Sequence, residues 1–97
     1  MEKFNEEVIN SIERSAVRKK ILLYLHSSAM STMYDIAVDT KTAYTNATGA
    51  IAGWGKRYGK ERSLIYLGLV YMEKGDRGLN VYSLTPEGQR LADVLDR

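Results

Sequence analysis

The last third of the chain contains two β-prone runs, a turn between them, and a helix start directly after them. The first run is Leu-Gly-Leu-Val-Tyr-Met-Glu at 67–73, and the second is Tyr-Ser-Leu at 82–84. The segment between them begins with Lys-Gly-Asp-Arg-Gly at 74–78, a composition typical of a hairpin turn. Thr85 suits the N-cap of a helix, and Pro86 suits its first position. We therefore predict a β-hairpin followed directly by a helix.

Apolar residues at helical spacing dominate the rest of the chain. This spacing predicts helices at 3–13, 15–28, 31–39 and 43–54, one or two further turns at 63–67, and a last helix at 86–95. Ser15 and Ser31 are the expected N-caps of the second and third helices, and whether the first two form one continuous helix stays open. The side chains expected to face the core are those of Phe4, Val8, Ile9, Ile12, Ala16, Val17, Ile21, Leu22, Leu25, Met33, Ile36, Ala37, Ala43, Ala47, Ala50, Ile51, Trp54, Leu91, Val94 and Leu95.

The composition is that of a small folded domain. The chain has 97 residues, of which 44% are apolar, so a single domain over 1–97 is expected. It has no cysteine, which excludes disulfides and fits a cytoplasmic location. No apolar run is long enough to cross a membrane, and the first residues lack the apolar block of a signal peptide. We expect no membrane partner.

Positive charge is concentrated in the middle of the sequence. The net charge is +2 overall, but it is −3 over residues 1–13, +6 over 14–80 and −1 over 81–97. The densest cluster is Lys-Arg-Tyr-Gly-Lys-Glu-Arg at 56–62. Clustered cations are typical of a surface that binds phosphates, although a solvated surface has the same composition.

The predicted order of helix, helix, turn, helix, hairpin and helix matches a winged helix-turn-helix, a mainly α fold with a small β-hairpin wing. Residues 15–25, Ser-Ala-Val-Arg-Lys-Lys-Ile-Leu-Leu-Tyr-Leu, resemble the opening helix of archaeal winged helix-turn-helix transcriptional regulators. Residues 44–58 resemble a segment found in a small subset of that family. Both are followed by its Ser-Leu, Leu-Gly-Leu-Val and Leu-Thr-x-x-Gly elements, so the resemblance covers 15–92. One departure is an additional segment between the 43–54 helix and Leu-Gly-Leu-Val.

The layout and the resemblance imply a DNA-binding transcriptional regulator. The helix at 43–54 is the expected recognition helix in the major groove, with the basic loop at 56–62 and the wing at 74–80 on the DNA backbone. An asparagine can pair with adenine, and threonines can bond to bases or pack on thymine methyl groups. The candidate DNA-binding residues are Lys41, Thr42, Tyr44, Thr45, Asn46, Thr48, Lys56, Arg57, Tyr58, Lys60, Arg62, Lys74 and Arg77.

Two glycines in the predicted recognition helix need an explanation, because each costs about 1 kcal/mol in a helix interior. Gly49 and Gly53 could let this helix approach DNA or another protein helix closely, or the helix could end near Gly49. The main alternative function is a winged-helix protein–protein interaction module without direct DNA binding, in which this face pairs with a partner. RNA binding has less support, because no aromatic pair shows an RNA-recognition spacing.

A homodimer is expected, because one small module buries too little DNA for specific binding and two copies would occupy a two-fold site. The candidate dimer surfaces are the last helix and the acidic helix at 3–13, with Phe4, Val8, Ile9 and Ile12.

The sequence contains no motif for catalysis or for a ligand. His26 is the only histidine, so neither a metal site nor a Ser-His-Asp triad has support. The Gly-x-Gly at 53–55 lacks the third glycine of a dinucleotide motif because Tyr58 stands there, and Trp54 and Glu61 break a phosphate loop. We therefore expect no enzyme activity, no cofactor, no metal and no small-molecule ligand.

Overall fold

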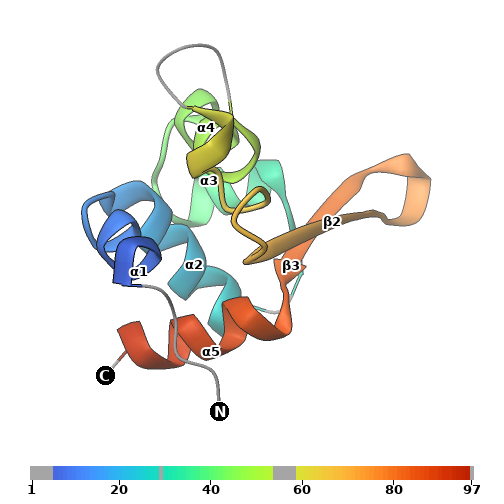
Figure 1. Cartoon of the computed structure of the whole chain (residues 1–97). Helices are drawn as coiled ribbons and strands as arrows, with labels where there is room; N and C mark the ends of the chain where they lie inside the picture. Colours follow the sequence, from blue (N-terminus) through green and yellow to red (C-terminus); the bar gives the residue numbers. More distant parts are fainter. Residues whose placement is uncertain (1–5, 29, 54–58, 97) are drawn as a thin grey trace.

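The computed structural model describes residues 6–28, 30–53 and 59–96, and over these the chain forms a winged helix-turn-helix (Figure 1). The elements are α1 (Glu6–Glu13), α2 (Ala16–Ser28), β1 (Ser31–Thr32), α3 (Met33–Asp39), α4 (Tyr44–Ala52), the 3-10 turn η1 (Lys60–Arg62), β2 (Val70–Lys74), the 3-10 turn η2 (Asp76–Gly78), β3 (Asn80–Leu84) and α5 (Pro86–Leu95). In Figure 1, α2 lies at the centre, α3 and α4 pack at one end, α5 lies at the other, and the β2–β3 hairpin projects sideways.

The first two helices are separate, which answers the question that the sequence left open. The backbone N–H of Ser15 donates to the carbonyl of Ile12, which closes α1 with a tight turn. The Ser15 hydroxyl then accepts from the backbone N–H of Arg18 at 3.2 Å. Ser15 is therefore the N-cap of α2, as predicted, because its side chain satisfies one of the N–H groups that a helix start leaves unpaired.

The sheet is larger than the predicted hairpin. Its strand order is β1-β3-β2, with both pairs antiparallel. The hairpin itself is confirmed, with Val70 opposite Leu84 and Lys74 opposite Asn80. The additional strand, β1, places Ser31 opposite Tyr82.

The predicted N-cap of α3 was wrong by one residue. Ser31 lies two residues before α3 begins at Met33, so it stands one position too early to be the N-cap. Thr32 takes that role, and its hydroxyl accepts from the backbone N–H of Asp35 at 3.1 Å. At the other end of the chain, Thr85 caps α5 as predicted and accepts from the N–H of Gly88 at 3.0 Å.

One hydrophobic core joins every helix to the sheet. Most of the predicted core positions are confirmed as buried, and the loop after η1 and the sheet contribute Leu64, Leu69, Val70, Tyr82 and Leu84 as well. Three predictions were wrong: Ala16 and Ala43 are exposed because they lie at or before a first helical turn, and Val94 is 47% exposed because it lies on the outer side of α5. Phe4 and Trp54 lie outside the described residues.

The first helix contributes its apolar side to this core. Ile12 is fully buried, while Val8 and Ile9 are partly buried against the core. The expectation that Ile12 lies on a dimer surface is therefore wrong, because its side chain is used inside the protomer.

Candidate nucleic-acid interface

The turn between α3 and α4 closes in a way that the sequence did not predict. Lys41 has a positive φ of 56°. Its N–H donates to the carbonyl of Val38, and that of Thr42 donates to the carbonyl of Ala37 at 2.9 Å. This bonding pattern is a Schellman motif, in which glycine is the usual residue at the left-handed position. The sequence indicates that a helix ends here, because the apolar pattern stops. Nothing in it indicates that a lysine takes the left-handed conformation.

The same turn is anchored to its neighbours. The hydroxyl of Thr40, a buried residue, donates to the carbonyl of Ile36 at 2.6 Å. The ammonium group of Lys20, on α2, donates to the carbonyl of Thr40 at 3.1 Å. Lys41 itself is exposed and Thr42 is half-buried. The start of α4 is thus held at a defined position, with the exposed side chain of Lys41 beside it.

The outer face of α4 is uncharged. Tyr44 is 56% exposed, Thr45 and Ala52 are exposed, and Asn46 and Thr48 are half-buried. The Thr48 hydroxyl donates to the carbonyl of Tyr44 at 2.9 Å, so it remains an acceptor for an outside partner. Because most of these side chains are short and project little from the helix, this face can approach the floor of a DNA groove closely.

The predicted bounds and glycine positions of this helix need correction. The helix runs from Tyr44 to Ala52, and it passes through Gly49 without ending there. Gly49 is buried, so it does not lie on the outward face where the sequence placed it. Gly53 is the C-cap, with a φ of 90°, a conformation that glycine adopts without strain. A Cβ at Gly53 would come within 2.9 Å of the Lys60 Cα, so the chain also packs closely there.

Residues 59–66, the described part of the additional segment after α4, pack against the end of that helix. The N–H groups of Leu64 and Ile65 donate to the carbonyls of Ala50 and Ile51 at 2.9 and 3.0 Å. These bonds satisfy carbonyls that the end of a helix otherwise leaves unpaired. The predicted turns at 63–67 are present as hydrogen-bonded turns, and Ser63 and Leu64 are buried. The two hydrogen bonds from Leu64 and Ile65 therefore hold the residues that follow η1 against the end of α4.

The structure brings some of the predicted basic residues close to α4. Lys60 and Arg62 are exposed on η1, which contacts α4. Lys56, Arg57 and Tyr58 lie outside the described residues.

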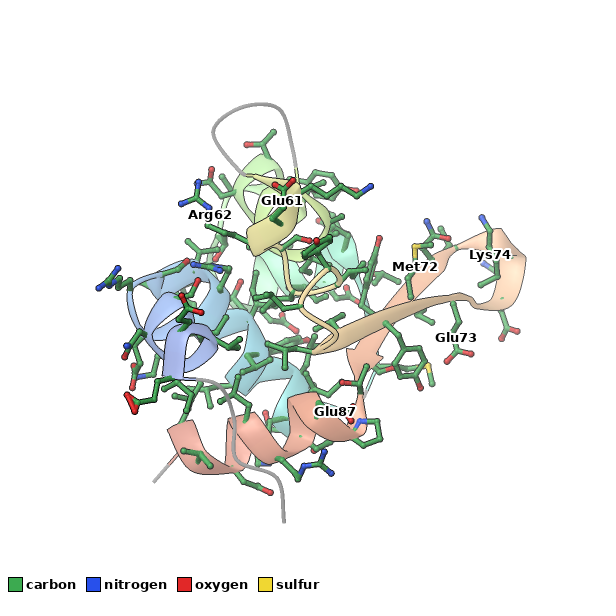
Figure 2. All side chains as sticks on the ribbon, viewed as in Figure 1. Glu61, Arg62, Met72, Glu73, Lys74 and Glu87 are labelled. Atoms are coloured by element: carbon green, nitrogen blue, oxygen red, sulfur yellow. The ribbon has the colours of Figure 1, made fainter. Side chains whose placement is uncertain are left out.

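The wing carries the other two predicted cations. Lys74 lies at the end of β2 and Arg77 lies at the hairpin tip, and both are exposed. Figure 2 shows Lys74 and Met72 on the side of the hairpin nearer to α4, with Glu73 pointing the other way. Because side chains alternate along a strand, this arrangement places Lys74, rather than Glu73, on the side of the hairpin that is nearer to α4.

Within the described ranges, no group of three or more His, Cys, Asp or Glu side chains could hold a metal ion. The His26 Nε2 instead lies 2.7 Å from Asp93 Oδ1, an ion pair that joins α2 to α5 if the histidine is protonated. The described helices are all too short or too polar to cross a membrane.

A family model described as EarA-like matches residues 8–95. The chain belongs to the EarA-like family. Two solved structures, both of one mutant of Lactococcus lactis ZitR, resemble the EarA-like chain in fold. The first has a TM-score of 0.67 at 19% identity, covering 84% of this chain and 50% of ZitR. The second, in apo form, has a TM-score of 0.68 at 17% identity, covering 94% and 66%.

The EarA-like chain thus spans between half and two thirds of the length of these ZitR chains. At such low identity the likeness concerns the fold alone, and it confirms the predicted winged helix-turn-helix fold. The winged-helix part of the predicted family is confirmed, while its regulatory function and archaeal membership stay predictions. No curated protein matches the sequence.

Proposed function

We propose that this EarA-like protein is a transcriptional regulator that binds double-stranded DNA, with α4 in the major groove. The observation that carries the proposal is the uncharged outer face of α4, with exposed cations on η1, which contacts α4, and on the wing. Thr45 lies on that face, Lys60 lies on η1, and Lys74 lies on the side of the wing that is nearer to α4 (Figure 2). Phosphate contacts position a protein on DNA, and contacts from a helix to base edges give it specificity.

The first experiment measures how binding depends on salt. A duplex selected from a random pool is titrated with the protein by fluorescence anisotropy at several salt concentrations. The wild-type affinity should fall steeply with salt, because each neutralised phosphate releases counterions. Lys60→Ala and Lys74→Ala should each reduce the slope of log affinity against log salt by about 1. Arg90→Ala is the matched control, because Arg90 is exposed on α5, at the opposite end from α4.

A second variant separates base recognition from phosphate contact. Thr45→Ala should weaken binding to the selected duplex by roughly 1 kcal/mol or more and leave binding to unrelated DNA unchanged. Absence of duplex binding at low salt, or an affinity that does not change with salt, would reject the proposal.

The proposal includes a homodimer on a two-fold DNA site and a cytoplasmic location. One module of this size presents a single short recognition helix, and two copies double the contact with DNA. A cysteine-free chain fits the reducing conditions of the cytoplasm.

A protein–protein interaction module is the second candidate function. Gly49 and Gly53 no longer support it, because one is buried and the other caps the helix. Its support comes instead from α3, where Tyr34 and Val38 are 67% and 52% exposed one turn apart. The DNA titration distinguishes the two functions, since this module would show no duplex affinity at low salt.

A further inference from the structure

A cleft of about 630 Å³ lies between α1, the start of α2, α4 and η1. Three arginines from three different parts of the chain line it: Arg14 after α1, Arg18 on α2 and Arg62 on η1. Figure 2 shows Arg62 on the side of η1 that faces α1 and α2. One carboxylate, that of Glu7, lines the same cleft. The lining therefore carries an excess of positive charge.

Arg18 is fixed in this cleft by neutral partners. Its Nη1 donates to the carbonyl of Arg62 at 2.7 Å, and its Nη2 donates to the carbonyl of Ser11 at 2.7 Å. Within residues 6–28, 30–53 and 59–96, no carboxylate forms an ion pair with Arg14, Arg18 or Arg62. Two carbonyls orient the Arg18 guanidinium without neutralising its charge.

The surroundings of Arg18 disfavour an uncompensated cation. Burial lowers the pKa of Arg18, and the positive charge of Arg62 lowers it further. Both effects would be relieved by a negative charge placed between the two guanidinium groups. Ser15, the N-cap of α2, also lines the cleft, so the positive end of that helix dipole acts in the same direction.

We propose that this cleft binds a small anion that carries carboxylate or phosphate groups. Guanidinium groups bind both kinds of anion through charge-assisted, often paired, hydrogen bonds. Gly49 and Ala50, both buried residues of α4, form part of the wall. Because they have little or no side chain, the cleft extends to the backbone of α4. A bound anion would therefore contact the inner side of the helix whose outer face is proposed to read DNA.

The inference does not depend on DNA binding, so its test uses the full chain without DNA. Citrate and inorganic phosphate serve as separate probes, titrated at constant ionic strength while amide and arginine side-chain NMR signals are recorded. Citrate, phosphate or both should give saturable shifts confined to the cleft, at Gly49, Ala50 and Arg18. Saturation by citrate alone or by phosphate alone identifies which group the cleft prefers.

The variant Arg14→Gln/Arg62→Gln should weaken the better probe about tenfold or more, because two charge-assisted hydrogen bonds are lost. Both residues are exposed, so the variant is expected to fold, which unchanged signals from α5 would verify. Arg90→Gln removes an arginine at the opposite end of the molecule and should leave anion affinity unchanged. Shifts that do not saturate, or equal losses in both variants, would overturn the proposal.

A last arm distinguishes a free anion from the phosphates of DNA. Arg62 is also a candidate DNA contact, so this comparison uses Arg14→Gln alone. If Arg14→Gln lowers duplex affinity when no small anion is present, the cleft belongs to the DNA surface and the small-anion proposal fails. If duplex affinity is unchanged in Arg14→Gln while anion affinity falls, the proposal is supported.

Discussion

At the scale of single residues, Tyr82 connects the sheet to the proposed DNA-binding helix. It lies on β3 and is only 7% exposed. Burial raises its pKa above the ordinary value of 10.0, and the nearby Tyr44, at the start of α4, raises it further. Hydrogen bonding with Asn80 acts in the opposite direction and is the smallest of the three effects.

This raised pKa predicts a loss of stability in alkaline solution. Above pH 10 the unfolded chain loses the Tyr82 proton while the folded chain keeps it, so the unfolded state gains stability. The contribution is complete below the unfolded pKa and is lost as the pH rises through the folded pKa. Urea unfolding at about pH 9 and about pH 11 should show a smaller loss of stability for Tyr82→Phe than for the wild type. Equal losses would mean that Tyr82 titrates normally in the folded protein.

At the scale of elements, the first turn of α5 packs directly against the backbone of the loop that precedes β2. Gly88 lies in its first turn and is buried. A Cβ at this position would overlap the carbonyl oxygen of Leu69, the atom that also accepts from the N–H of Thr85 at 3.0 Å. The Thr85 hydroxyl donates in turn to the carbonyl of Gly68 at 2.6 Å. Backbone contact, rather than side-chain packing, fixes where this helix begins.

We expect Gly88→Ala to destabilise the fold by roughly 1–3 kcal/mol, because the added methyl group forces α5 away from Leu69. Helix propensity alone predicts the opposite sign, since alanine is better than glycine in a helix by about 1 kcal/mol. Urea unfolding measures the difference, with the exposed neighbour Gln89 changed to Ala as a control expected within about 0.5 kcal/mol of wild type. A stable Gly88→Ala variant would contradict the close contact.

The elements differ in how well the sequence predicts them, and the reason is the distance over which each is determined. The caps at Ser15 and Thr85 and the hairpin depend on neighbours in sequence, and they were predicted correctly. β1 has two residues and exists because β3 pairs with it, so no local pattern indicates it. The candidate site follows the same rule. Lys60 and Lys74 could be identified as exposed cations, whereas the cleft around Arg18 joins segments that are far apart in sequence.

At the scale of the whole molecule, the first and last helices, α1 and α5, both pack against α2 (Figure 1). The core uses Ile12 from α1 and Leu91 from α5, so both helices are needed within one protomer. The outer surfaces of α1 and α5 are therefore the part of these helices that a second copy of the chain could contact. This surface includes Val94, which is 47% exposed. This surface is separated from α4 and the wing, so a dimer formed here would leave them accessible.

The proposed homodimer predicts a matched pair of outcomes in sedimentation velocity at micromolar concentration. The wild type should sediment as a dimer, and Val94→Asp should shift it to monomer, because a buried and unpaired carboxylate is costly at an apolar interface. Val38→Asp introduces the same change on α3, where Val38 is 52% exposed, and should leave the dimer intact. A monomeric wild type, or a dimer that withstands Val94→Asp, would reject this interface.

The pairing of Ser31 with Tyr82 has a consequence for synthesis on the ribosome. Helices α1 to α4 are translated long before β3 and α5, yet Leu84, Leu91 and Ala92 complete the core in which those helices are buried. Until these residues leave the exit tunnel, the nascent chain exposes apolar surface that it cannot cover by itself. We therefore expect the fold to form only after these residues have emerged, and chains that stop before Leu84 should be substrates for chaperones and proteases.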